Sequence, residues 1–285
     1  MTIEMKRINI RIGPDRYDIL SSDQYLRQMR PGFGRKFEST VKAMLGIDAF
    51  EPRLTKLIQF IAPKDGIALD VGANIGCTSL LLSGIARAVV AFEPVPTTFD
   101  LLSRNVKAAG KTNISLHNFA LGSEQKQSTM YYAEADRSGA FVADNLSGEQ
   151  NGQASISIRP LDSVWASLAL DSLDFMKIDV EGYELNVLKG ASRTLQQFRP
   201  IIEMEANSWC LNVMQRLSLP DFVDFVLSTF PEAYAVEDAT YLDLRIGADR
   251  WRFFERNVLH QQFRELVVGY GDGRLRPLLT AYKRL

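Results

Sequence analysis

A regular exchange of short apolar runs with longer amphipathic stretches limits the fold of this 285-residue chain more than any other feature. The stretch GIALDVG predicts a buried strand ending at Asp70. The segments after it predict in turn a helix, a strand, a helix and a strand, over residues 77–86, 88–94, 97–110 and 113–121. This order is typical of an α/β protein with a mostly parallel sheet.

The pattern changes after Gly122. Residues 126–145 and 153–161 alternate polar with apolar or β-branched residues and enclose a loop rich in Gly, Asn and Ser, which predicts an inserted β-hairpin. The α/β pattern then resumes. Helices are expected over 161–169, 183–198 and 219–230, buried strands over 173–180 and 200–206, and a late antiparallel pair over 233–237 and 240–244.

Three regions are expected along the chain. Residues 1–55 form a mixed N-terminal extension, residues 56–248 form the ligand-binding α/β domain, and residues 249–285 form a basic, helical or irregular tail that packs on the same domain. A formal net charge of −1 gives no general case for nucleic-acid binding. Two cysteines without metal-ligand spacing, no signal-peptide pattern and no long apolar run favour a cytoplasmic protein without a transmembrane segment. The oligomeric state is left open.

The turn DVGANIG follows the first predicted strand and has the position of a nucleotide-binding turn. A dinucleotide fingerprint needs three glycines, but Asn74 and Cys77 stand where the second and third would fall after Gly72. Asp70 would also repel a pyrophosphate, whereas it would favour a cationic or amine-bearing ligand. These residues argue against NAD.

Polar side chains gather where the predicted parallel strands end, which is where α/β sheets bind ligands. Glu93 ends the second strand, 21 residues after Gly72, and suits a carboxylate that accepts from both hydroxyls of a ribose. Asp179 and Glu181 end the fourth strand, and Glu205 ends the fifth. S-adenosylmethionine carries adenosine, a sulfonium and an ammonium group but no phosphate, so it fits this set of residues.

The stretches DVGANIG, AFEPVPTTFDLLSRN, NFALG and DFMKIDVEGYELNVLKGA resemble the FkbM-type S-adenosylmethionine-dependent methyltransferases over about residues 50–207. The resemblance implies a class I methyltransferase fold: a Rossmann-like α/β fold, with a mostly parallel sheet, carrying here the inserted hairpin and the N-terminal extension. It also implies O-methylation of a sugar, polysaccharide or glycosylated natural product. The cofactor residues that it implies, with their neighbours in the motifs, are Asp70, Gly72, Ala73, Asn74, Gly76, Thr78, Glu93, Pro94, Asn118 and Ala120.

Asp179 and Glu181 are the expected catalytic residues, one of them as general base for the acceptor hydroxyl. Asp179 is preferred if the acceptor lies over the sulfonium, and Glu181 if the acceptor enters from the hairpin side. Asp179, Glu205 and Asn207 also offer the oxygen ligands that Mg²⁺ prefers, but a metal is not favoured. The hairpin segment 137–139 is a candidate for the acceptor lid. Two rival hypotheses are an NAD-dependent oxidoreductase and a non-catalytic module that binds a glycan or a partner.

Overall fold

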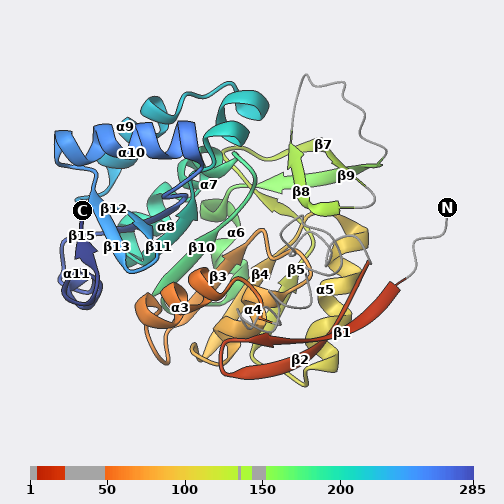
Figure 1. The fold of residues 1–285 in the computed structure, drawn as a ribbon. Coiled ribbons are helices and arrows are strands. Elements are labelled where there is room, and N and C mark those ends of the chain that lie inside the picture. The colour runs from red at the N-terminus through yellow and green to blue at the C-terminus, as the bar shows by residue number, and fades with distance from the viewer. Residues whose placement is uncertain (1–4, 23–48, 134–135, 143–151) are drawn as a thin grey trace, which may run out of the picture.

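A computed structural model of the chain describes residues 5–22, 49–133, 136–142 and 152–285 (Figure 1). Its central sheet has nine strands within these residues. Their order is β15 (Lys283–Arg284), β13 (Thr240–Asp243), β12 (Glu232–Glu237), β14 (Glu265–Gly269), β11 (Ile201–Glu205), β10 (Phe175–Ile178), β3 (Ile67–Val71), β4 (Ala88–Phe92) and β5 (Ile114–His117). The five strands from β11 to β5 are mutually parallel, as the sequence predicts.

Helices cover both faces of this sheet, because the apolar strands are buried on both sides. Alternate residues of β3 and β10 enter two different cores. Ala68 and Phe175 pack on one face with α3 (Pro52–Ile61), α4 (Cys77–Ser83), α5 (Pro96–Ala108) and α11 (Arg276–Ala281). Leu69 and Met176 pack on the other with α6 (Leu161–Leu168), α7 (Glu184–Gly190), α8 (Ser192–Phe198), α9 (Leu219–Thr229) and α10 (Gly247–His260). The predicted class of fold is confirmed.

A second sheet of four strands lies beside the carboxyl end of the first (Figure 1). It has the order β6 (Ala120–Leu121), β9 (Gly152–Arg159), β7 (Lys126–Ala133) and β8 (Asp136–Val142), and β7 pairs antiparallel with both β8 and β9. Met130, Val142 and Ile158 pack with Tyr183 in a small core under it. The inserted hairpin is therefore part of a larger sheet.

The N-terminal region adds a hairpin of β1 (Met5–Ile12) and β2 (Asp15–Ser22). Asn105 of α5 ties this hairpin to the glycine turn, because its Oδ1 accepts from the backbone N–H of Leu20 at 2.7 Å while its Nδ2 donates to the carbonyl of Ile75 at 2.9 Å. The hairpin thereby supports the turn that follows β3.

Two segments differ from the sequence-based expectations. The helix predicted over 183–198 is broken at Ala191 into α7 and α8. Residues 249–285 are more than a tail, because β14 lies inside the central sheet between β11 and β12, antiparallel to both. The predicted antiparallel pair is present as β12 and β13. Among the described residues, no helix combines the length and apolar character needed to cross a bilayer.

Candidate active site

The site lies where β3 and β10 run side by side, because the chain leaves β3 toward β4 on one side and later returns to β10 on the other. Ligands of open α/β sheets bind beyond the strand ends at such a switch point. Gly72 allows the two strand ends to meet there. Its φ is 85°, and a Cβ at this position would lie 1.8 Å from the carbonyl oxygen of Asp179. The backbone N–H groups of Gly72 and Ala73 both donate to the carbonyl of Phe92, at 3.1 and 3.0 Å.

A cavity of about 890 Å³ opens at this point. This volume lies in the range of small-molecule and cofactor sites. Seven of the ten expected cofactor residues line it, namely Gly72, Ala73, Asn74, Thr78, Glu93, Pro94 and Ala120. The two expected catalytic residues, Asp179 and Glu181, line it as well.

Glu93 is held rigidly at the wall of this cavity. One carboxylate oxygen accepts from the backbone N–H of Asn74 at 3.0 Å and the other from that of Val95 at 2.9 Å. Each oxygen keeps lone-pair capacity for a further donor. The side chain is only 6% exposed, and burial raises the pKa of Glu93 to about 7. This geometry suits acceptance from two adjacent hydroxyls.

Three of the expected cofactor residues do not line the cavity. Asp70 was expected to face a cationic ligand. It is instead fully buried below the turn, where it accepts from the Ser79 hydroxyl at 2.5 Å. The side chain of Asn118 donates to the carbonyls of Glu93 and Pro94, at 2.8 and 3.0 Å. Gly76, with a φ of 97°, is the N-cap residue before α4. These three residues shape the loops and do not form the cavity wall.

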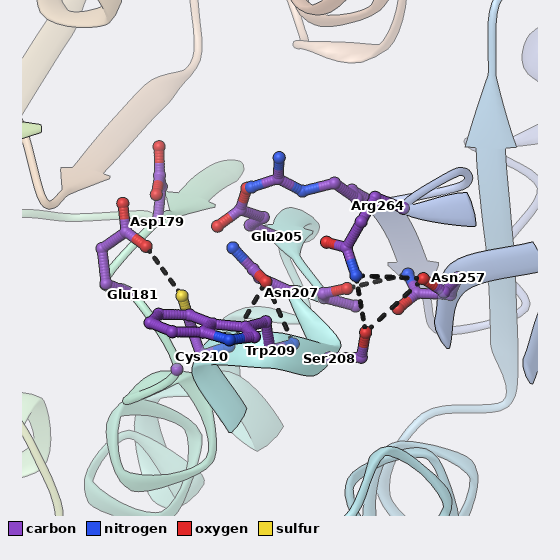
Figure 2. Close-up of polar contacts among 12 residues, drawn as sticks. Asp179, Glu181, Glu205, Asn207, Ser208, Trp209, Cys210, Asn257 and Arg264 are labelled. Carbon is purple, nitrogen blue, oxygen red and sulfur yellow. Dashed lines mark hydrogen bonds and ion pairs between the residues drawn. The ribbon is translucent and has the colours of Figure 1, made fainter. Parts of the chain in front are cut away.

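The turn after β10 presents Asp179 and Glu181 to the cavity. Glu181 and Gly182 are successive residues with positive φ, 52° and 95°, which reverses the chain sharply before α7. The carboxylates of Asp179, Glu181 and Glu205 converge, with oxygens within 4.8 Å of one another (Figure 2). Glu184 lies apart from them, because it accepts from the backbone N–H groups of Val180 and Gly182, both at 3.2 Å.

Each carboxylate in this group has its own partner. Asp179 forms an ion pair with Lys177 at 2.9 Å. Glu205 forms one with Arg264, and Glu181 accepts from the Cys210 thiol at 3.0 Å (Figure 2). Burial first, and the charge of Asp179 second, raise the pKa of Glu181 to about 7. A carboxyl group with such a pKa is suited to general base catalysis near neutral pH.

Asn207 does not join this group through its oxygen. Its Oδ1 accepts from the backbone N–H groups of Trp209 and Cys210, at 3.2 and 3.3 Å, at the start of the π-helix η1 (Cys210–Met214). The Mg²⁺ ligand set of Asp179, Glu205 and Asn207 stays a prediction, with the amide oxygen of Asn207 already used by the backbone. The third carboxylate that lies beside Asp179 and Glu205 is Glu181.

Six charged residues that line the cavity were not predicted from the sequence, namely Glu51, Arg53, Lys177, Glu203, Arg264 and Glu265. A signal for two of them exists. Lys177 stands two residues before Asp179, and Glu203 two residues before Glu205, within apolar strands. Alternate residues of a strand share a face, so this spacing predicts that Lys177 and Glu203 lie behind Asp179 and Glu205.

Met130 and Val142 of the inserted sheet add apolar side chains to the cavity wall, and Tyr183, the residue before α7, lines it too. The side chains of residues 137–139, expected in the acceptor lid, lie outside the described residues. His260, exposed at the end of α10, is not among the residues that line the cavity.

Comparison with known proteins decides the family. The profile described as Methyltransferase FkbM domain matches residues 70–237, which span the turn after β3, the inserted sheet and the Asp179–Glu181 motif. The chain belongs to the FkbM methyltransferase family. Membership confirms the resemblance seen in the sequence and sets aside the NAD-dependent oxidoreductase.

Similar proteins include the hexuronic acid methyltransferase AglP of Haloferax volcanii, with 32% identity over 53% of this chain and 61% of that protein. Methyltransferase 1 of Beauveria bassiana is 23% identical over 45% of this chain and 59% of that protein. The chain therefore spans about three-fifths of these relatives. A solved FkbM methyltransferase from Methylobacillus flagellatus KT is 22% identical, with a TM-score of 0.41, over 60% of this chain and 38% of that one.

Proposed function

We propose that this chain is an S-adenosylmethionine-dependent O-methyltransferase acting on a hydroxyl of a sugar, a polysaccharide or a glycosylated natural product. The carrying observation is the cavity at the β3–β10 switch point, which Glu93 and the converging carboxylates of Asp179, Glu181 and Glu205 all line. No nucleic-acid partner is part of the proposal.

The residues present suit this cofactor. Glu93 would accept from the two ribose hydroxyls, and Pro94 and Ala120 would lie beside the adenosine. The turn from Gly72 to Asn74 would lie against the methionine portion, with Thr78 near it. Asp179 and its neighbouring carboxylates would place negative charge near the sulfonium and the ammonium, which favours a cation.

When bound, the cofactor supplies the methyl group, which passes to the acceptor oxygen while the electrons of the broken carbon–sulfur bond remain on sulfur. The protein must align the acceptor oxygen and receive its proton. Glu181 is our candidate base, because it is buried, faces the cavity and has a pKa raised to about 7. Asp179 would remain beside the sulfonium as an anion paired with Lys177.

The acceptor class is supported by the family and by one relative. AglP is named for the methylation of a hexuronic acid, and the match covers part of its length. A sugar acceptor agrees with that name. Transfer to a hydroxyl, and not to a carboxylate, is our own extension from the family resemblance.

Two titrations and one product analysis test this function. Calorimetry should give binding of S-adenosylmethionine and of S-adenosylhomocysteine, and no binding of NADH. Incubation with S-adenosylmethionine and an accepted glycan should release S-adenosylhomocysteine. If S-adenosylmethionine binds but no S-adenosylhomocysteine is released in the presence of glycan extracts, the result would favour the rival hypothesis of a non-catalytic binding module.

Glu93→Ala should weaken S-adenosylmethionine binding by about 1.5–3 kcal/mol, the range for hydrogen bonds to a charged group. The thermal transition should persist, which circular dichroism checks. Glu255→Ala, an exposed position on α10, is the matched control and should bind as the parent does. An unchanged affinity of Glu93→Ala would remove the ribose assignment.

Excess chelator should leave methyl transfer unchanged. Each of the three carboxylates, Asp179, Glu181 and Glu205, already interacts with a side chain of this chain. The side-chain oxygen of Asn207 already accepts a hydrogen bond from the backbone. Turnover measured with and without chelator, and after addition of Mg²⁺, checks this. Loss of turnover that Mg²⁺ restores would contradict it.

A further inference from the structure

A row of buried ionisable side chains crosses the central sheet behind the rim of the site. Lys177 of β10 lies in register with Asp70 of β3 on one side and with Glu203 of β11 on the other. The three residues are 0–4% exposed. Buried carboxylates are costly unless a cation accompanies them, so the ammonium of Lys177 is needed between these two.

Lys177 also reaches forward into the site. Asp179 follows it by two residues on the same side of the chain, and the ammonium lies 2.9 Å from Asp179 Oδ2. The side chain of Lys177 lines the cavity. Burial lowers the pKa of Lys177, but Asp179, Asp70 and Glu203 together raise it above its ordinary value, so the ammonium stays charged.

The neighbouring carboxylate is held differently. Glu181 accepts from the thiol of Cys210, which is a weak donor. Arg264 also lies beside the carboxylates, but it is paired with Glu205 (Figure 2). Glu51 before α3 and Glu265 of β14 are two further carboxyl groups in the cavity wall, and burial raises the pKa of both. The two carboxylates of the motif therefore have unequal support: one has a strong, buried, charged donor and the other has not.

We propose that Lys177 is a positioning residue for methyl transfer, which pins the Asp179 carboxylate in the cavity as a fixed anion and leaves Glu181 to accept the proton. This inference rests on the proposed function for its catalytic part. Its geometric part, that Asp179 keeps its place through Lys177, stands independently of the reaction.

The geometric part is tested by crystal structures of the parent, of Lys177→Met and of Lys177→Met combined with Glu203→Gln. The double variant removes one buried carboxylate charge together with the ammonium, so it protects the fold if the single variant is unstable. We expect the Asp179 side chain to leave its parental position in both variants. An unchanged Asp179 in either would overturn the proposal.

The catalytic part is tested by kinetics with S-adenosylmethionine and the accepted glycan. Turnover of Lys177→Met should fall roughly tenfold or more, with a smaller loss of cofactor affinity than in Asp179→Asn, because the Asp179 anion stays in the cavity but loses its alignment. Lys56→Met, on the exposed face of α3, is the control and should match the parent. Equal turnover in Lys177→Met and Lys56→Met would refute the role.

Chemical rescue tests whether the Lys177 ammonium acts by donating a hydrogen bond or only through its charge or its size. Ethylammonium should restore part of the turnover of Lys177→Ala, whereas tetramethylammonium, which cannot donate, should not. Equal effects of the two ions would contradict positioning through a hydrogen bond. If the parent itself transfers no methyl group, the proposed function fails while the crystal structures still decide the placement of Asp179.

Discussion

Gly72→Ala should destabilise the folded protein by at least about 3 kcal/mol and abolish measurable S-adenosylmethionine binding. A non-glycine residue at a φ of 85° carries a strain of order 1–3 kcal/mol. The larger cause is the backbone carbonyl of Asp179, 1.8 Å from the new Cβ. Since backbone atoms cannot swing aside, the ends of β3 and β10 must separate, and that displaces the turn that carries Asp179 and Glu181.

Gly110→Ala is the matched control for this prediction. Gly110 also has a positive φ, 65°, but nothing lies within 4 Å of its hypothetical Cβ. It should lose only about 1 kcal/mol and retain cofactor binding. Denaturant unfolding and calorimetry on both variants measure the difference. Equal losses in the two would show that close approach of the strands is not what requires Gly72.

Glu181→Gln should lower turnover by about 10² to 10⁴, the usual contribution of a positioned base, with little change in cofactor affinity. The amide keeps the shape of the side chain but cannot accept the proton. Because the pKa of Glu181 is raised to about 7, parental turnover should fall as the pH drops below 7 and Glu181 becomes protonated. The variant should lose this dependence.

Asp179→Asn should instead weaken cofactor affinity and turnover together, because it removes an anion from the cavity. His260→Ala, outside the cavity lining, should behave as the parent does. Kinetics and calorimetry over a range of pH separate these patterns. If Asp179→Asn and Glu181→Gln both turn over at near parental rates, the motif is structural and the base lies elsewhere.

The parallel core of the sheet was predictable because its strands are continuous apolar runs separated by amphipathic helices. The strand β14 was not, since ELVVG is short and follows a helix rich in arginine. Its place in the sheet depends on long-range pairing with β11 and β12, which periodicity along the sequence does not carry.

The candidate site was predictable where polar residues end strands, as at Glu93, Asp179 and Glu205. The burial of Asp70 could not be predicted, because a residue at a strand end faces either the ligand or the core. Only the packing of α4, with Ser79, decides between the two. The surroundings of Asn207 depend on packing in the same way, since its oxygen accepts from backbone N–H groups at the start of η1. Arg264 was missed because β14 was missed.

The most direct test of the account is transfer of a labelled methyl group. The protein is incubated with S-adenosylmethionine bearing a deuterated methyl and with glycan and glycosylated-metabolite extracts, and the products are analysed by mass spectrometry before and after mild alkali. The account predicts a labelled sugar whose methyl ether survives alkali, formed by the parent and greatly reduced with Glu181→Gln. A label lost in alkali would mark a methyl ester and contradict transfer to a hydroxyl, and the absence of any labelled product would contradict the proposed activity itself.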